Sequence, residues 1–177
     1  LYPKYLIGYA TRESLILEFC PTMLSLILAG KVGSNIASEI GSMRVTEQID
    51  ALEIMGVNSA SFLILPKIIA AVLFFPALII LSISIGIIGG WIGCQTVSIT
   101  TASYLYGIKY EFSSFYVSYC LIKTVVFAFI IASVSSYFGY YTKGGALEVG
   151  SSSTRAVVYS SIVILIFNFI LTDLLLG

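Results

Sequence analysis

Residues 62–97 read FLILPKIIAAVLFFPALIILSISIGIIGGWIGCQTV, and this apolar run decides the class of fold. A helix rises about 1.5 Å per residue, so the run is longer than the hydrocarbon core of a bilayer, which is about 30 Å thick. No polar turn divides the run, and Pro76 offers a point at which a helix can bend. The run therefore predicts one tilted or kinked transmembrane helix with a cytosolic foot.

The rest of the chain has the composition of a membrane protein. Of its 177 residues, 58% are hydrophobic and only 10% are charged. Three more stretches are apolar enough to span a bilayer or come close to it, namely 15–30, 115–138 and 156–176. We therefore predict an all-α polytopic integral membrane protein with four transmembrane helices, forming a single domain over residues 1–177.

Composition also excludes several kinds of chemistry. Nine Lys and Arg balance nine Asp and Glu, so the chain lacks the basic field that a nucleic acid partner requires. It contains no histidine, which excludes His-based triads and His metal sites. Cys20, Cys94 and Cys120 lack CxxC spacing and are expected to be packing residues. AGKVGS at residues 29–34 lacks the first glycine and the final Ser or Thr of a P-loop. We expect no catalytic residue, metal or cofactor in this chain.

The basic residues predict the orientation of the spans. Four spans place both ends of the chain on one side of the membrane. Residues 31–67 and 139–155 form the loops on the other side, and they contain more Lys and Arg than the segments facing them. The positive-inside rule makes these two loops cytoplasmic. The residues compared are Lys31, Arg44, Lys67, Lys143 and Arg155 against Lys4, Arg12 and Lys109.

A charged segment, SEIGSMRVTEQIDALEIMG at residues 38–56, interrupts the apolar sequence. At about 100° per residue, its carboxylates at 47, 50 and 53 share one helical face and its apolar residues at 45, 49, 52 and 55 share the other. We predict a short amphipathic helix, with a break before it at Gly41 and Ser42, a stop at Gly56, and Pro66 beginning the next span. An acidic face disfavours a lipid anchor, which leaves a solvated loop helix or a helix that docks to a partner protein.

Two ionisable residues fall inside predicted spans. A charge in a bilayer costs at least about 3 kcal/mol and usually faces a cavity or a partner, so Glu18 and Lys123 are candidate site residues. Their depths in the predicted spans differ by about five residues, or about 7 Å, which a lysine side chain partly bridges. They form either a structural ion pair or a polar spot in an apolar substrate pathway.

The segment AGKVGSNIASEIGSMRVTEQIDALEIMGV at residues 29–57 resembles the signature loop of the MlaE-type permeases. The likeness continues through LPKIIAAVLFFPAL at 65–78, CLIKTVVF at 120–127 and residues 144–176. It implies the membrane subunit of an ABC system that moves phospholipid between bacterial membranes. Such a permease has five spans after an amino-terminal interfacial helix, so the interfacial helix and first span are expected to be missing here.

The resemblance also implies partners and residue roles. The permease is expected in the bacterial inner membrane as a homodimer, with an ATPase subunit that uses ATP and Mg and with an MCE-domain lipid-binding protein. Residues 38–56 match the coupling helix that contacts the ATPase, which implies contacts from Gly41, Arg44, Glu47, Gln48, Asp50 and Glu53. Glu18 matches a cavity glutamate, although the arginine usual before it is Leu17 here. Lys123 matches the lysine of the CLIK motif, and Arg155 matches the arginine after the last cytosolic loop.

Three functional hypotheses follow. The first is a lipid-transporting ABC permease without catalysis of its own. The second is a membrane scaffold that assembles the ATPase and the lipid-binding protein without transport. The third is a secondary transporter that uses Glu18 as a proton or ion relay.

Overall fold

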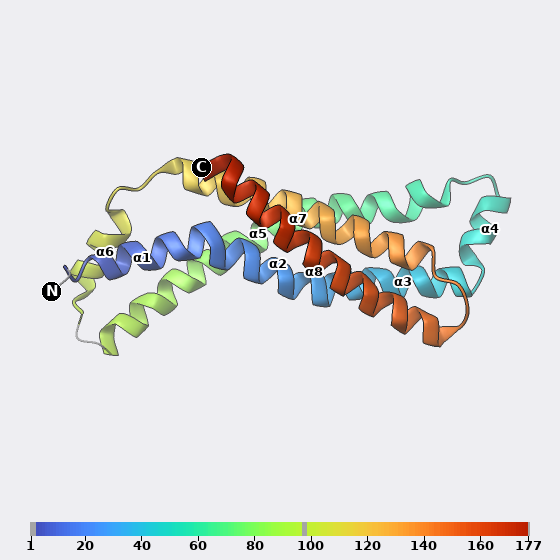
Figure 1. The fold of residues 1–177 in the computed structure, drawn as a ribbon, viewed down its shortest axis with the longest axis horizontal. Coiled ribbons are helices and arrows are strands. Elements are labelled where there is room, and N and C mark those ends of the chain that lie inside the picture. The colour runs from blue at the N-terminus through green and yellow to red at the C-terminus, as the bar shows by residue number, and fades with distance from the viewer. Residues whose placement is uncertain (1–2, 97–98, 177) are drawn as a thin grey trace.

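The computed structural model describes residues 3–96 and 99–176, and every regular element within these ranges is a helix (Figure 1). Four helices are long and apolar enough to cross a membrane, as predicted: Leu6–Val45, Ser59–Thr96, Ser114–Tyr140 and Ala146–Leu176. Both ends of the chain lie at one end of the bundle, and the short helix α4 (Gln48–Ile54) lies at the other. This arrangement confirms the predicted all-α polytopic fold.

The first span is longer than the predicted stretch 15–30. It runs without interruption through α1 (Leu6–Ser14), η1 (Leu15–Met23), α2 (Leu24–Leu28), η2 (Ala29–Gly33) and α3 (Ser34–Val45). The segments η1 and η2 are π-helical, and η1 contains Pro21, which has no N–H to donate to the regular helical pattern. Hydropathy missed α1 because this helix contains polar residues, for two of which, Thr11 and Arg12, the protein itself supplies hydrogen-bond acceptors.

Arg12 is the clearest example of such a residue. It was expected outside the spans, but it lies within α1 with only 2% of its surface exposed. Its guanidinium donates to the carbonyl oxygens of Ile108 at 2.7 Å and Tyr110 at 2.8 Å. These bonds fix the end of α6 (Thr101–Lys109) against α1, at the end of the bundle where the chain begins.

The short helix predicted within 38–56, between a break at Gly41 and Ser42 and a stop at Gly56, is wrong in its extent. Helix α3 passes through Gly41 and Ser42 and ends at Val45, and α4 follows after a turn in which Glu47 has a φ of 59°. The helix does not break at Gly41 because this glycine is buried: a Cβ there would lie 3.3 Å from Thr142 Oγ1. The stop at Gly56 is confirmed, since its φ is 78° and the Val57 N–H donates to the Leu52 carbonyl at 3.1 Å.

The second span, α5 (Ser59–Thr96), is one helix, as predicted. It begins seven residues before Pro66, which lies inside the helix together with Pro76. The helix begins this early because Asn58 supplies a cap: its side-chain oxygen accepts a hydrogen bond from the Ser61 N–H at 3.1 Å. The predicted end at residue 97 lies outside the described residues.

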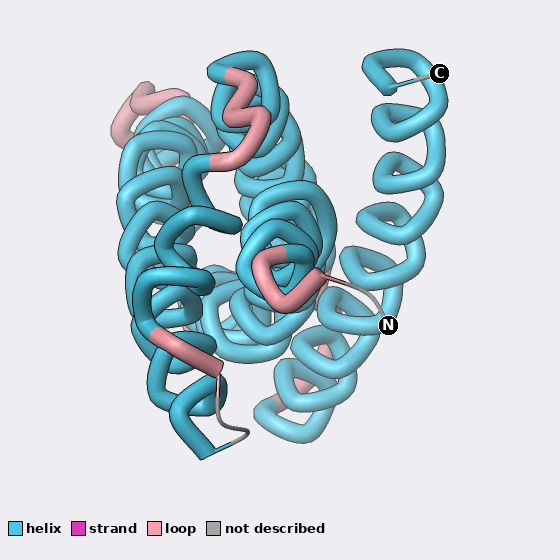
Figure 2. The backbone as a smooth tube through the Cα atoms, turned by 90° about the vertical axis from the view of Figure 1, so that its left-hand side faces the viewer, coloured by secondary structure: helices cyan, strands magenta, loops and turns pink. Residues whose placement is uncertain are grey.

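The third span, α7 (Ser114–Tyr140), packs closely on α3 and η2 of the first span through small residues. A Cβ at Gly139 would lie 2.7 Å from the Ala37 carbonyl oxygen, and one at Gly33 would lie 2.8 Å from Ser135 Oγ. Such contacts let helix backbones approach each other in lipid. The last span, α8 (Ala146–Leu176), completes the bundle, and Figure 2 shows its C-terminal end at the side of the bundle.

Candidate functional site

Lys123 lies at the centre of a polar cluster inside the bundle. Its side chain is fully buried in α7. The Nζ atom donates to Glu18 Oε1 at 2.8 Å, to the Tyr119 hydroxyl at 2.9 Å and to the Leu17 carbonyl at 3.3 Å. The structure therefore brings together the two intramembrane charges singled out in the sequence, and it pairs them.

Glu18 links this lysine to the last span. Its Oε2 atom accepts hydrogen bonds from Asn168 Nδ2 and from Thr22 Oγ1, both at 3.1 Å. Thr172 Oγ1 lies 3.1 Å from the other carboxylate oxygen. The Glu18 side chain remains 44% exposed, whereas the Lys123 side chain is fully buried.

Sequence reasoning missed four members of this group. We define the ion-pair cluster as Glu18, Thr22, Tyr119, Lys123, Asn168 and Thr172. Helical spacing was the available signal, because Tyr119 lies four residues before Lys123, and Asn168 lies four before Thr172, each within an apolar span. Polar residues at this spacing share a helix face and so point to a common partner.

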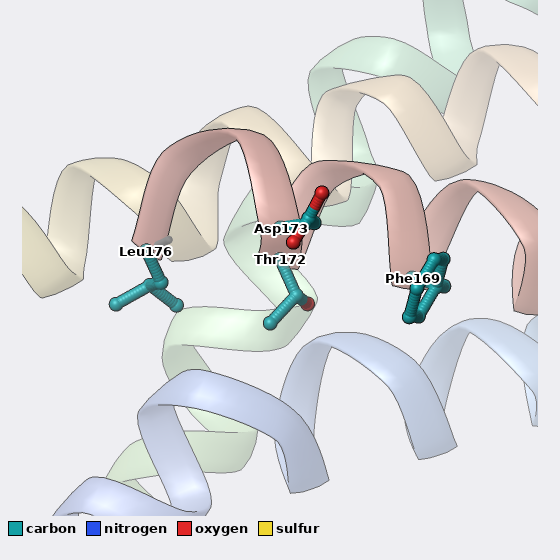
Figure 3. A pocket seen from close by; sticks show the side chains of 4 residues that line it. All are labelled: Phe169, Thr172, Asp173 and Leu176. Carbon is teal, nitrogen blue, oxygen red and sulfur yellow. The ribbon is translucent and has the colours of Figure 1, made fainter.

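A hollow of about 260 Å³ lies beside the cluster along α8, lined by Phe169, Thr172, Asp173 and Leu176. Figure 3 shows Thr172 and Leu176 pointing from α8 toward the first span. Because Thr172 also bonds with Glu18, the cluster adjoins this hollow. The arrangement places a polar group at the edge of a largely apolar space.

A second set of contacts holds α4 against the spans. Arg44, in the last turn of α3, donates to Asp50 Oδ1 at 2.6 Å, and its guanidinium carbon lies 5.7 Å from the centre of the Tyr140 ring. Glu53 Oε1 accepts hydrogen bonds from Ser59 Oγ and from the Tyr140 hydroxyl, both at 2.9 Å. These donors, Ser59 first, hold the pKa of Glu53 below its ordinary value of 4.5.

The predicted coupling residues therefore divide into two groups. Asp50 and Glu53 bind their own chain, as Arg44 does, and Gly41 is buried under the turn between α7 and α8. Glu47 and Gln48 are exposed. The exposed surface of α4 also contains Ile54, 87% exposed, and the neighbouring Met55, a residue of the predicted apolar face, is exposed as well. Arg155 lies exposed on α8.

Two helices connect the ion-pair cluster with the contacts that hold α4. Glu18 and Arg44 belong to the same uninterrupted first span, and Lys123 and Tyr140 belong to α7. The helix α4 therefore contacts, at one end of the bundle, both of the helices that carry the ion pair. Within the described residues, no group of three or more His, Cys, Asp or Glu side chains could hold a metal ion.

Comparison with known proteins gives the family. The model of the family described as Permease MlaE matches residues 2–174. A probable ABC transporter permease protein of Rickettsia bellii is 43% identical over 91% of this chain and 62% of its own length. One of Synechocystis is 39% identical over 96% of the chain and 65% of its own length. The intermembrane phospholipid transport system permease protein MlaE of Haemophilus influenzae is 34% identical over 97% of the chain and 66% of its own length.

The chain spans 62% of the length of the Rickettsia relative, so the match covers most of this chain but not the whole of that protein. The family match covers the first three spans, the fourth as far as residue 174, the ion-pair cluster and α4. This chain belongs to the MlaE permease family.

Proposed function

We propose that this chain acts as the permease subunit of an ABC transporter that moves phospholipid or a related lipid between membranes. The names of its relatives support this role, since one is a probable ABC transporter permease and another a phospholipid transport system permease. In this role the chain catalyses no reaction. A partner ATPase hydrolyses ATP with Mg, and the permease supplies the lipid path.

The position of α4 carries the proposal. This helix is bound to Arg44 at the end of one span and to Tyr140 at the end of another. Each of those spans contains one member of the Glu18–Lys123 pair. A rigid-body movement of the ATPase against α4 is therefore passed to both helices, and it shifts the packing around the ion pair between two states.

The ion-pair cluster supplies hydrogen-bonding groups along the proposed lipid path. Lys123 and Asn168 hold the partly exposed Glu18 carboxylate in place. A lipid headgroup carries both phosphate oxygens and polar hydrogens, so it can exchange hydrogen bonds with such a cluster as the lipid passes. The adjoining hollow on α8 accommodates an acyl chain of the lipid.

The proposed complex lies in the bacterial inner membrane. It contains a second copy of this chain, an ATPase subunit and an MCE-domain lipid-binding protein. Gly89 and Gly93 on α5 have open space around them, which would allow another helix to approach closely. This observation supports the second copy.

The ATPase contact is proposed to use the exposed surface of α4. Asp50 and Glu53 are engaged within the chain, so Glu47, Gln48, Ile54 and Met55 remain to meet the partner. Reversing the charge of Glu47 together with Ile54→Asp is expected to abolish co-purification of the ATPase while the permease still folds. Normal co-purification of this variant would contradict the proposed contact.

Lipid transfer between vesicles tests the function itself. The full-length protein, assembled with its ATPase, is expected to move labelled phospholipid only when ATP is hydrolysed. Assembly without ATP-dependent movement would identify a scaffold. Movement driven by a proton gradient alone, and lost in Glu18→Gln, would identify a secondary transporter.

A further inference from the structure

A groove of about 340 Å³ runs between the first span and α5, in the half of the bundle that contains α4. Asn35 and Glu39 line it from the first span, and Lys67, Phe74 and Leu78 line it from α5. Residues at 67, 74 and 78 lie seven and four apart, so they follow one face of α5. The groove shares no residue with the ion-pair cluster.

The two ends of the groove differ in chemistry. At the end nearer α4, Lys67 Nζ lies 2.6 Å from Glu39 Oε2, and this ion pair joins the two helices across the groove. Toward the other end, the groove is lined by Phe74 and Leu78, which are exposed, and by Phe75, which is buried. The groove is therefore amphipathic along its length, with one positive and one negative group at the polar end.

The length of the groove matches one leaflet of a bilayer. From Lys67 to Leu78, α5 advances eleven residues, which is about 16 Å at about 1.5 Å per residue. Half of a hydrocarbon core of about 30 Å is about 15 Å. With the ion pair at headgroup level, the apolar part of the groove extends approximately to the middle of the membrane.

We propose that this groove binds one zwitterionic phospholipid from the leaflet on the α4 side, with an ethanolamine headgroup at the ion pair and an acyl chain along Phe74 and Leu78. Lys67 pairs with the phosphate, and Glu39 pairs with the ammonium group. A cation and an anion side by side complement a zwitterion better than a lipid of net negative charge. This site does not depend on the proposed transport function.

Quenching of tryptophan by brominated lipid tests the site in the full-length protein. The only tryptophan of the printed sequence is removed as Trp91→Phe, and a single reporter is introduced as Phe74→Trp or, as the control, Leu73→Trp. Both positions are 68% exposed on adjacent residues, but only Phe74 lines the groove. Vesicles contain phosphatidylglycerol, which has a net negative charge, with increasing fractions of brominated phosphatidylethanolamine, or of brominated diacylglycerol, which lacks the phosphate.

A bound lipid is expected to quench residue 74 at a several-fold lower fraction of brominated phosphatidylethanolamine than residue 73, with no such difference for diacylglycerol. Glu39→Gln with Lys67→Met should remove the difference, and Lys67→Arg should retain it. A variant that fails to fold would instead change the quenching of the reporters at both 73 and 74. Equal quenching at 73 and 74 would overturn the proposal, as would weaker quenching at 74, the result expected if another helix covers the groove. Quenching at 74 that survives the double substitution would also overturn it.

Discussion

Glu18 and Lys123 are separated by 105 residues in sequence, yet their side chains form an ion pair of 2.8 Å inside the helical bundle. The two members differ sharply in environment, because Lys123 is fully buried and Glu18 is 44% exposed. A buried ammonium without its carboxylate is costly, whereas the Glu18 carboxylate has further hydrogen-bond partners in Thr22, Asn168 and Thr172. The pair is therefore asymmetric, and its two members should respond differently to substitution.

Glu18→Gln is expected to destabilise the protein more than Lys123→Met does. The first change leaves Lys123 charged and only partly satisfied, at a cost of about 2 kcal/mol, and the double variant should recover part of that loss. Thermal unfolding of the purified variants in detergent measures the effect. Equal stability of Glu18→Gln and the double variant would show that the lysine charge is not the cause.

Asn168→Leu should reduce lipid transfer several-fold while changing the unfolding temperature only slightly. The substitution removes the amide that donates to Glu18 and leaves the Glu18–Lys123 pair in place. Ser161→Ala is the matched control, because Ser161 also lies on α8 but bonds only to the carbonyl of Val157 in its own helix. Equal transfer rates for the two variants would demote Asn168 to a packing residue.

Lowering the pH should loosen α4. The pKa of Glu53 is below 4.5 in the folded protein, so its bonds with Ser59 and Tyr140 stabilise α4 fully above about pH 4.5 and are lost as the pH falls through the folded pKa. Tyr140→Phe removes one donor and returns the pKa toward 4.5. Loosening should then begin at a higher pH, which hydrogen exchange of residues 48–54 measures. Identical pH profiles for the two proteins would contradict this account.

Hydropathy was sufficient to predict the spans, because lipid requires long apolar helices whatever their neighbours. It could not locate the start of the first span. Arg12 looks like a loop residue until its bonds to the carbonyls of Ile108 and Tyr110 are known, and these acceptors lie more than 90 residues away. The true start therefore depends on tertiary contacts that helical periodicity does not contain.

The candidate site, like the spans, could be predicted from the sequence only in part. The cost of a charge in lipid was enough to select Glu18 and Lys123, and the structure shows them as an ion pair, which was one of the two alternatives left open. Asn168 was not selected, because an amide is cheaper than a charge and its bond to Glu18 crosses 150 residues. On α4, periodicity grouped the carboxylates on one face, but it did not show that Asp50 and Glu53 bond to Arg44 and Tyr140 of their own chain.

Two glycines provide a matched test of helix packing. Gly139→Ala should destabilise the protein by about 1 to 3 kcal/mol, because the new Cβ would lie 2.7 Å from the Ala37 carbonyl oxygen and force α3 and α7 apart. Gly89→Ala should be neutral or stabilising by up to about 1 kcal/mol, since nothing lies within 4 Å of its Cβ and alanine favours the helix. Unfolding in detergent compares them within the single chain. In the assembled membrane complex, a loss of dimer on Gly89→Ala alone would place the second copy against that face of α5, and an unchanged dimer would place it elsewhere.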